Sequence, residues 1–339
     1  MKILVTKYPG TGEFETFFTD EARKKLESLG EVIYNPHGRP YTDEELRDAL
    51  EGVDVVFTGW GAYNFSEEVL AKADKLKIIA HTGGSVAQVI SEALKKRNVI
   101  ILCGNRLFAE SVAEGTLCYI LAAQRNLVKT VNITAEEGWP ETYMPNRGLK
   151  GKTIGLVGFG MIAENLARIL QSFDVKLKIY SGYLSVEKAA QYNAELATLD
   201  EIFETCDIIS VHSALNDKNY HLINKNHFAK MKDDALIVNT ARGAVMVEEE
   251  LAEELKKGRI RAILDVYEEE PLSMESPLRG LPNAILVPHR GGPTTDVRAM
   301  VTIALAGDIK KFMNGDTNLT HQVSYEYGSR MTNEAKFRK

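Results

Sequence analysis

The chain has 339 residues, a length that fits about two domains of ordinary size. Apolar residues make up 44% and charged residues 26%, the balance of a soluble globular protein and not of a disordered one. With 41 Lys and Arg against 47 Asp and Glu, the net charge is −6, so there is no basic field to attract a nucleic-acid backbone.

Targeting segments and cysteine pairs are not apparent in the sequence. No run of about eighteen apolar residues could span a membrane, and the apolar run at the start is too brief for a signal peptide. Cys103, Cys118 and Cys206 are scattered without metal-ligand spacing, and we expect buried thiols in a reducing compartment. These features predict a cytoplasmic protein without a nucleic-acid partner, a membrane span or a metal site.

Short β-branched runs alternate with helix-period segments along most of the chain, which is typical of βαβ units and parallel sheets. In the first half, the pattern predicts strands at 2–6, 32–34, 53–57, 76–80 and 99–102, and helices at 20–29, 42–50, 66–73, 86–96 and 111–127. In the second half, it predicts strands at 153–157, 176–180, 207–212, 235–239, 261–266 and 284–287, and helices at 162–173, 199–206, 224–229, 248–257 and 294–312. We therefore expect an α/β fold with doubly wound parallel sheets, the second of six strands.

Two segments have no predicted element. Residues 130–150 contain two Pro and two Gly and show no sustained period, so they are either a linker or a loop with a specific role. The tail, residues 321–339, is polar and has no clear pattern.

The sharpest local signal is a glycine turn between a predicted strand and a predicted helix. Gly158, Gly160 and Ala163 follow the G-x-G-x-x-G/A pattern of dinucleotide-binding folds. The first glycine permits a tight turn, the second lets the backbone approach a pyrophosphate, and Ala163 permits close packing of the helix on the strand. Backbone N–H groups of the following helix start, at Met161 and Ile162, would face the phosphates. A glycine turn that serves only packing is the alternative.

The residue that usually distinguishes NAD from NADP is missing. At the end of the next predicted strand, about twenty residues on, Ser181 stands where a carboxylate would hold the ribose hydroxyls of NAD. Neither an acid nor an adjacent Arg is present, so the cofactor is predicted to be NAD or NADP without a choice between them.

Three polar residues stand at or just past the ends of predicted strands, where open parallel sheets bind ligands. They are Arg242, Glu270 and His289. A guanidinium can clamp a carboxylate or keto group, and an imidazole can donate or accept a proton near neutral pH. A carboxylate bonded to the imidazole would favour its charged form. Singly, each residue is more simply a capping Arg, a solvated acidic turn or an uncommitted loop His, but their joint occurrence with a dinucleotide turn favours a catalytic site.

In these motifs the sequence resembles the D-isomer-specific 2-hydroxyacid dehydrogenases, a family that includes phosphoglycerate dehydrogenase and glyoxylate/hydroxypyruvate reductases. The resemblance covers nearly the whole chain. It is carried by SVAEGTL (111–117), LKGKTIGLVGFGMIA (149–163), NTARGAVMVEEEL (239–251), ILDVYEEEP (263–271) and VPHRGG (287–292).

The resemblance implies two domains, of which one interrupts the other. A Rossmann nucleotide-binding domain, 104–290, would be inserted into a flavodoxin-like substrate domain made of 1–103 and 291–339. Residues 130–150 would form a dimerisation arm, with Trp139 and Tyr143 as interface residues of a homodimer.

The resemblance also implies a role for each motif residue. Arg242 matches the substrate-binding arginine, His289 the catalytic histidine and Glu270 its paired carboxylate. Positions near the nicotinamide are matched by Thr240, Ala241 and Asp265, and the loop under the cofactor by His212 and Ser213. The loop that would hold the substrate carboxylate through backbone N–H groups contains His81, Gly83, Gly84, Ser85 and Val86.

Several positions depart from the family pattern and leave the substrate open. Besides Ser181, the unusual residues are Ser85, Ala87, Phe108, Val247, Arg290 and Gly292. We therefore expect an NAD(P)-dependent enzyme that interconverts a small 2-hydroxy acid and its 2-keto acid. Two alternatives stay open: a non-catalytic dinucleotide sensor resembling the corepressors of this fold, and a dehydrogenase of the same fold acting on a sugar acid.

Overall fold

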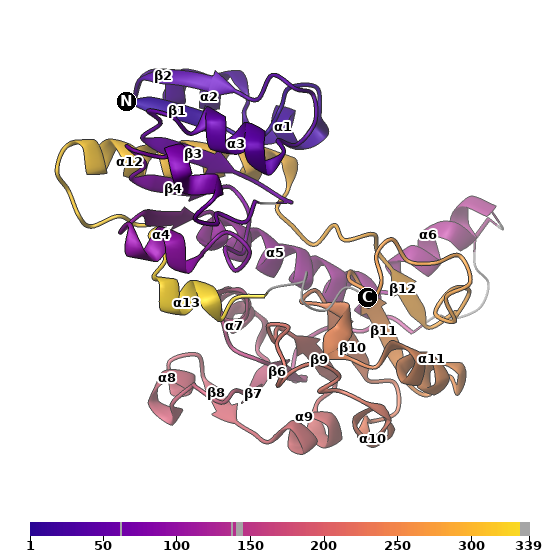
Figure 1. Cartoon of the computed structure of the whole chain (residues 1–339). Coiled ribbons are helices and arrows are strands. Elements are labelled where there is room, and N and C mark those ends of the chain that lie inside the picture. Colours follow the sequence, from indigo (N-terminus) through magenta and orange to yellow (C-terminus); the bar gives the residue numbers. More distant parts are fainter. Residues whose placement is uncertain (62, 137, 140–144, 333–339) are drawn as a thin grey trace. The chain divides into compact units, whose positions relative to one another are not determined.

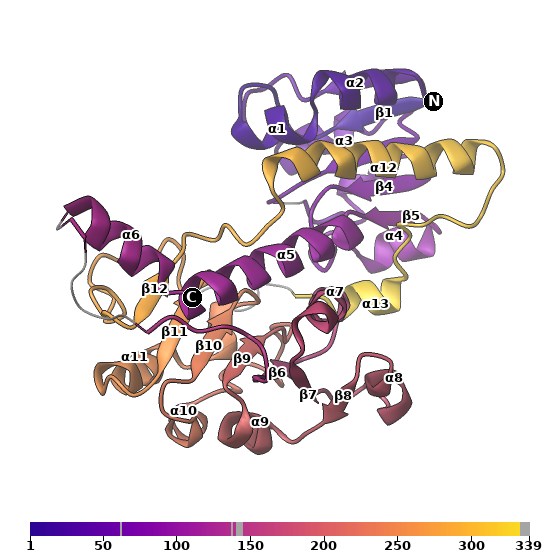
Figure 2. The same cartoon turned by 180° about the vertical axis from the view of Figure 1, so that it is seen from behind.

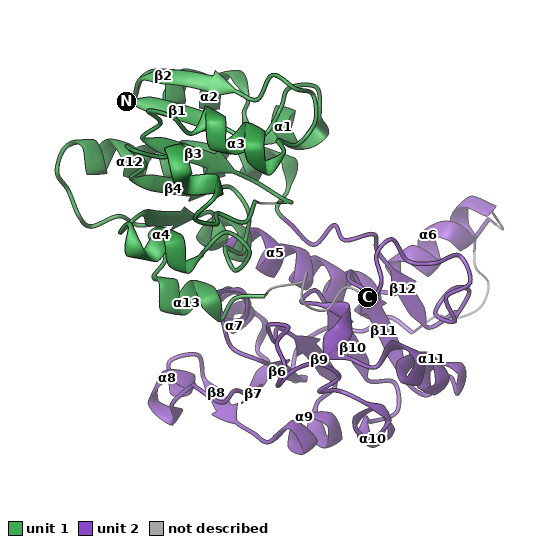
Figure 3. Ribbon diagram, viewed as in Figure 1, with its two compact units in different colours: residues 1–109, 293–339 green, residues 110–292 purple. Residues whose placement is uncertain are grey.

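The chain folds into two compact units in a computed structural model that describes residues 1–61, 63–136, 138–139 and 145–332. One unit consists of Met1–Ala109 and Pro293–Lys339, and the other of Glu110–Gly292 (Figure 3). The boundaries thus lie after Ala109 and Gly292, a few residues beyond those that the family resemblance implies. Within the described residues, no helix is both long and apolar enough to cross a lipid bilayer.

The first unit is built on a five-stranded parallel sheet in the order β2-β1-β3-β4-β5. This is the flavodoxin-like strand order. Its strands are β1 (Lys2–Val5), β2 (Glu31–Tyr34), β3 (Val55–Thr58), β4 (Ile78–His81) and β5 (Ile100–Cys103).

Helices cover both faces of this sheet because successive strand residues point to opposite sides. Ile3 and Val5 face a core shared with the first group of helices, whereas Leu4 faces the other core. The first group, in front of the sheet in Figure 2, is α1 (Gly12–Phe17), α2 (Asp20–Glu27) and α12 (Thr295–Met313). The second group is α3 (Asp43–Ala49), the 3₁₀ turn η1 (Val69–Lys72) and α4 (Glu92–Lys96), with α13 (Tyr325–Ser329) beyond them (Figure 1).

The second unit is built on a seven-stranded parallel sheet in the order β12-β11-β10-β9-β6-β7-β8. This is the Rossmann strand order with one further strand, and the order reverses between β6 and β9. The strands are β6 (Thr153–Val157), β7 (Lys176–Tyr180), β8 (Ala194–Leu196), β9 (Ile208–Val211), β10 (Leu236–Asn239), β11 (Arg261–Leu264) and β12 (Ala284–Leu286).

The helices of this unit lie between the strands in sequence. They are α5 (Asn105–Gln124, which starts in the first unit), α6 (Leu127–Glu136), α7 (Met161–Leu170), η2 (Gln171–Phe173), α8 (Val186–Ala190), α9 (Leu199–Thr205), α10 (Lys225–Lys230), η3 (Gly243–Val245) and α11 (Glu248–Lys256). Small residues of α7, Ala163 and Ala167, are fully buried against the sheet, which lets the helix approach β6 closely.

Several predicted elements were wrong. The second sheet has seven strands because β8, of only three residues, was missed. Residues 130–136, where no regular structure was expected, belong to α6 (Leu127–Glu136). The helix predicted at 86–96 shrinks to α4, because Ser91 caps it at Leu94 N–H. Short helices α1, α8 and α13 were also missed. Cys118, expected to be buried, is exposed, whereas Cys103 and Cys206 are buried.

The C-terminal tail, which had no predicted element, is part of the first unit's core. Cys103 N–H donates to the His321 carbonyl and Val323 N–H to the Ile101 carbonyl, so the tail runs beside β5. Its Val323 is 5% exposed. Apolar burial thus holds a segment that reads as polar overall.

Candidate functional site

The glycine turn after β6 is shaped by a close approach to the loop after β9. Gly158 has φ +94°, and a Cβ there would lie only 2.8 Å from the backbone nitrogen of Ser213. A side chain at this position would therefore collide with backbone. Gly160 differs, because nothing lies within 4 Å of its would-be Cβ. Gly158 thus allows the turn to pack against the loop after β9, whereas Gly160 leaves open space at the start of α7.

This open space suits a dinucleotide phosphate. Gly160 is the N-cap of α7 and supplies no side-chain cap, so the first N–H groups of the helix, at Met161 and Ile162, are available to an anion. Ala163 behind them is fully buried. The uncapped helix start and the open space at Gly160 therefore fit a dinucleotide pyrophosphate.

The loop after β9 is held by its own side chains. Ser213 Oγ donates to the Val157 carbonyl at 3.1 Å, and Ser210 Oγ lies 2.9 Å from His212 Nε2. Burial lowers the pKa of His212 to about 4, so the imidazole is neutral at neutral pH.

The loop after β7 carries Ser181, whose hydroxyl accepts a hydrogen bond from Tyr183 N–H at 3.3 Å. Gly158 N–H donates to the Tyr180 carbonyl, which ties this strand end to the glycine turn. Ser181 thus follows β7 beside the turn, at the strand end where the cofactor ribose is expected.

His289 and Glu270 are joined by a hydrogen bond. His289 Nδ1 lies 2.8 Å from Glu270 Oε2, and their side chains are 45% and 33% exposed. The hydrogen bond and charge of Glu270 raise the pKa of His289 despite the opposing effect of burial. Burial pushes the pKa of Glu270 upward, but the His289 bond and charge bring it below its ordinary value. The pair therefore favours imidazolium with carboxylate.

Arg242 follows β10, which is the neighbour of β11 in the sheet. Its positive charge lowers the pKa of both Glu270 and His289. Its backbone carbonyl accepts from Asn239 Nδ2 at 3.0 Å, and Asn239 Oδ1 accepts from Ala241 N–H at 3.0 Å. The buried Asn239 amide thus shapes the turn that presents Arg242. Sequence reasoning missed this role, although an Asn at a strand end is a signal for such a turn.

Asp265 is 2% exposed, and its carboxylate is occupied by the loop after β12. It accepts hydrogen bonds from Arg290 N–H at 2.6 Å, Gly291 N–H at 2.8 Å and Tyr119 Oη at 3.1 Å. His289 N–H donates to the Asp265 carbonyl, and His289 has φ +52°, a left-handed conformation that is costly outside glycine. Asp265 therefore fixes the loop that carries His289.

Helix α5 packs against the loop that carries His289. A Cβ on Gly115 would overlap the Gly291 backbone, so only glycine lets α5 pack there. Thr116 Oγ1 lies 2.9 Å from Thr240 Oγ1, in the turn before Arg242. These contacts give the SVAEGTL motif a physical role that its sequence alone does not indicate.

The loop at 81–86 belongs to the first unit, where it follows β4. His81 is 3% exposed, with Nδ1 2.8 Å from Thr58 Oγ1, and burial and then the Lys7 charge lower its pKa to about 4. In the part of the chain that the structure describes, the backbone N–H groups of residues 83–86 donate no hydrogen bond. They are therefore available to an anionic ligand.

Neighbouring residues constrain this loop. A Cβ on Gly84 would lie 3.0 Å from the Phe108 ring, and one on Gly83 would overlap the His81 ring. Ser85 Oγ donates to the Thr332 carbonyl at 2.8 Å, and Val86 is fully buried. Of the positions that depart from the family pattern, Ser85 thus ties the loop to Thr332, and Phe108 packs against Gly84.

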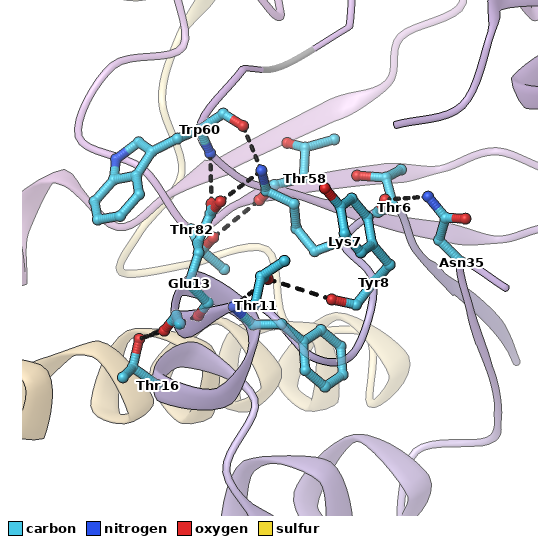
Figure 4. A network of polar contacts seen from close by, with 12 residues as sticks. Thr6, Lys7, Tyr8, Thr11, Glu13, Thr16, Asn35, Thr58, Trp60 and Thr82 are labelled. Carbon is cyan, nitrogen blue, oxygen red and sulfur yellow. Dashed lines mark hydrogen bonds and ion pairs between the residues drawn. The ribbon is translucent and has the colours of Figure 1, made fainter. Parts of the chain in front are cut away.

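A polar network at the same edge of this sheet was not expected from the sequence (Figure 4). Lys7 Nζ lies 2.6 Å from Glu13 Oε2 and donates to the Trp60 carbonyl, while Glu13 Oε1 accepts from Trp60 N–H. Thr82 Oγ1 donates to the Thr58 carbonyl. The network joins the loops after β1, β3 and β4, and no motif indicated it.

The fold and these residues define a dinucleotide-binding α/β protein with polar residues at the carboxyl ends of its strands. Comparison with known families identifies it further: residues 117–291 match the D-isomer specific 2-hydroxyacid dehydrogenase, NAD binding domain. The chain belongs to the D-isomer specific 2-hydroxyacid dehydrogenase family, as its motifs had predicted.

Relatives with curated names agree with this assignment. The chain is 34% identical over 301 residues to a D-3-phosphoglycerate dehydrogenase of Methanocaldococcus jannaschii, covering 88% of this chain but 56% of that protein. It is 36% identical over 292 residues to a glyoxylate reductase of Thermofilum pendens, covering 84% and 86%. The chain thus spans little more than half the length of the phosphoglycerate dehydrogenase.

Solved structures confirm the two-sheet α/β fold. A crystal structure from Thermus thermophilus has a TM-score of 0.76 and 27% identity, covering 96% of this chain and all of that one. Among the described residues, no group of three or more His, Cys, Asp or Glu side chains could hold a metal ion.

Proposed function

We propose that this protein interconverts a 2-keto acid and the corresponding 2-hydroxy acid with NAD or NADP as the redox cofactor. The observation that carries the proposal is the His289–Glu270 hydrogen bond, with Arg242 after the neighbouring strand β10, at the carboxyl edge of the sheet that also carries the Gly158–Gly160 turn. A bound nicotinamide would supply a hydride in the reduction and accept one in the oxidation.

His289 acts as the proton donor and acceptor. In the reductive direction, the imidazolium protonates the oxygen of the keto carbon as it becomes a hydroxyl, and in the oxidative direction the neutral imidazole removes that proton. Glu270 holds Nδ1, which leaves Nε2 for the substrate and stabilises the imidazolium. The raised pKa of His289 keeps the acid form populated near neutral pH.

Arg242 binds the substrate carboxylate or keto oxygen. A guanidinium offers two parallel N–H donors to such a group. The backbone N–H groups of residues 83–86 form the second carboxylate site of the proposal, supported by their availability within the first unit. Thr240, Ala241 and Asp265 belong to the proposed nicotinamide side, where the buried Asp265 acts by ordering the His289 loop.

The dinucleotide would be held by the glycine turn and its neighbours. Gly158, Gly160 and the α7 start, with Met161 and Ile162, would bind the pyrophosphate, Ser181 would lie at the ribose, and His212 and Ser213 would line the cofactor loop. Ser181 offers no negative charge to repel a 2′-phosphate, so both cofactors belong to the proposal.

We also propose a homodimer that uses the region of the predicted arm. On α6, Leu127, Val128 and Val131 are 52%, 44% and 55% exposed, and Trp139 is 88% exposed. Apolar side chains exposed together are typical of protein interfaces. Tyr143, the other predicted interface residue, lies outside the described residues. Free thiols at the three cysteines support a reducing compartment such as the cytoplasm.

The test is nicotinamide absorbance with glyoxylate, hydroxypyruvate, pyruvate and longer keto acids, each with NADH and with NADPH. Oxidation of either cofactor by one acid is expected, and the better cofactor settles the role of Ser181. His289→Ala should lose most turnover and keep the dinucleotide affinity, which fluorescence titration measures. Tight dinucleotide binding without turnover across the panel would instead favour the sensor function, and full activity of His289→Ala would refute the mechanism.

A further inference from the structure

Helix α11 begins without a cap of its own. Its N-cap residue is Val247, whose side chain can accept no hydrogen bond, and the structure shows no side-chain cap there. The first N–H groups of a helix need acceptors from outside the helix. At α11, the acceptor for Glu248 N–H is the carboxylate of Glu268, with Oε1 at 2.8 Å.

The interaction between Glu248 and Glu268 is reciprocal. Glu268 N–H donates to Glu248 Oε2 at 3.1 Å, so each carboxylate accepts the backbone N–H of the other residue. Glu268 lies in the loop after β11, two residues before Glu270. Two hydrogen bonds, one from each backbone N–H, therefore join the start of α11 to the loop that carries Glu270.

The contact is reinforced by the backbone on either side. A Cβ on Gly243 would overlap the Tyr267–Glu268 peptide, so the turn just after Arg242 packs directly on the Glu270 loop. Tyr267 N–H donates to Glu270 Oε1 at 3.1 Å, and Tyr267 Oη donates to the Val287 carbonyl at 3.0 Å. The orientation of the Glu270 carboxylate thus depends on where residues 267 and 268 lie.

A histidine joins the pair of glutamates from a third loop. His221 Nε2 lies 3.2 Å from Glu268 Oε2, and the two side chains are 32% and 30% exposed. His221 N–H donates to the Ala244 carbonyl at 2.9 Å, which places it on the turn after Arg242. Glu268 therefore contacts both the start of α11 and the loop after β9.

Two adjacent carboxylates repel one another, and the environment of the Glu248–Glu268 pair both adds to and offsets this repulsion. Burial and the charges of Glu268, Glu249 and Glu269 raise the pKa of Glu248, although the bond from Glu268 N–H opposes this. Negative charge is favoured in the first turn of a helix by the helix dipole, and α11 places Glu248 there. The two backbone hydrogen bonds thus hold Glu248 and Glu268 together against the repulsion between their carboxylates.

We infer that Glu248 and Glu268 form a clamp that positions Glu270, and through Glu270 the imidazole of His289, for the proposed reaction. They are positioning residues, since neither touches the catalytic histidine in the structure. The inference rests on the proposed function for its catalytic consequence, but the clamp itself is a property of the protein alone.

The acidic run supplies its own control. Glu269 lies between Glu268 and Glu270, and among the described residues its side chain makes no hydrogen bond or ion pair. Glu268→Ala removes the acceptor for Glu248 N–H and the contact with His221. Glu268→Gln keeps an acceptor oxygen and loses the charge. Glu269→Ala removes a carboxylate of the same run, whose charge acts on Glu248, but leaves both backbone hydrogen bonds of the clamp in place.

The first readout needs no substrate. The pKa of His289 is measured by NMR of its imidazole across the pH range in the full-length protein. The charged groups that act on this imidazole are Glu270, Arg242 and Asp265. In Glu268→Ala we expect the His289 pKa to fall, because Glu270 loses its fixed orientation, whereas Glu269→Ala should titrate like the wild type. Thermal unfolding of each variant checks that it is folded.

The second readout is steady-state kinetics with the keto acid that the wild type reduces. Glu268→Ala should lower kcat on the order of tenfold or more, the cost of misplacing a catalytic group, with the dinucleotide Kd unchanged. Glu268→Gln should restore much of the loss. Identical His289 titration in folded Glu268→Ala, Glu269→Ala and wild type would overturn the clamp. A wild type without turnover would overturn the proposed function instead, and the titration would still decide the clamp.

Discussion

His289 Nδ1 and Glu270 Oε2 lie 2.8 Å apart, although the two residues follow different strands. Glu270 comes six residues after the end of β11, and His289 three residues after the end of β12, the neighbouring strand of the sheet. Parallel strands that are neighbours end at the same edge, so loops of suitable length bring such side chains together. Asp265, at the root of the first loop, binds the backbone of the second and fixes the pairing.

The first prediction concerns pH. The pKa of His289 lies above its ordinary value of about 6.5, chiefly because of the hydrogen bond to Glu270. Reduction needs the imidazolium, so kcat/KM for the keto acid should hold below this pKa and fall as the pH rises through it. Oxidation needs the neutral imidazole, so kcat/KM for the hydroxy acid should rise over the same interval.

In Glu270→Gln the hydrogen-bonded charge is gone, while burial and Arg242 still lower the pKa of His289. The fall in the reductive profile should therefore move to lower pH, which kcat/KM measured across the pH range would reveal. An unmoved profile in Glu270→Gln would mean that another group controls the titration.

Arg242 is the subject of the second prediction. Arg242→Ala should raise KM for the keto acid by roughly a hundredfold, since hydrogen bonds to a charged group contribute about 3 kcal/mol. Arg242→Lys should recover only part of the loss, because an ammonium cannot bind bidentately. Michaelis curves of both variants test this, and an unchanged KM in Arg242→Ala would refute the clamp on the substrate.

The central elements and the site motifs were predictable because strong local rules govern them. Gly158 is required by the turn geometry and Ala163 by close packing, and the strand ends that carry Arg242 and Glu270 are marked by buried apolar runs. The motif resemblance then led to the family that the comparison confirmed. The pairing of His289 with Glu270 was implied by the motif resemblance, and the hydrogen bond between them agrees with it.

Other features depend on contacts between distant parts of the chain, which no local pattern reveals. The tail that hydrogen bonds beside β5 reads as polar, and α6 runs into a stretch with two Pro and two Gly that made residues 130–150 look irregular. The buried Asp265 looked like a ligand-facing acid, but its carboxylate is used by backbone N–H groups 25 and 26 residues later. Such long-range polar contacts form only after the sheet is assembled.

The third prediction separates the two glycines of the turn. Gly158→Ala should be destabilised, because its φ of +94° is costly for a residue with a Cβ, by at least about 1 kcal/mol, and because the new atom meets the Ser213 backbone. Gly160 has φ −115° and open space around it, so Gly160→Ala should lower the stability by no more than about 1 kcal/mol, the usual scale of N-cap substitutions.

In Gly160→Ala we expect a loss of dinucleotide affinity although the stability of the fold is nearly unchanged. The Cβ of Gly160→Ala would occupy the space proposed for the pyrophosphate, so the Kd for the dinucleotide should rise while the unfolding midpoint is kept. Calorimetry for stability and fluorescence titration for affinity give both numbers. Wild-type affinity in Gly160→Ala would place the phosphates elsewhere.

The last prediction concerns the anchor of the tail. Asp308 is on α12 with a side chain only 2% exposed, and its carboxylate accepts from His321 N–H at 2.7 Å and lies 2.9 Å from His321 Nδ1. Burial raises the pKa of Asp308, but the hydrogen bonds from His321 and Lys311 outweigh it and lower the pKa below its ordinary value. A carboxyl whose pKa is lower in the folded state stabilises the fold above its unfolded pKa, near 4, and loses that contribution as the pH falls through the folded value.

Asp308→Ala should therefore lower the free energy of unfolding by roughly 2 to 3 kcal/mol at neutral pH, the scale for hydrogen bonds to a charged group. The variant should also lose part of the wild type's decline in stability below about pH 4. Lys311→Ala is the contrast, because its side chain is 44% exposed, and it should cost less than about 1 kcal/mol. Urea unfolding at several pH values measures all three proteins. If Asp308→Ala were as stable as Lys311→Ala at neutral pH, the apolar contacts of the tail and its backbone hydrogen bonds to β5 would suffice to hold it.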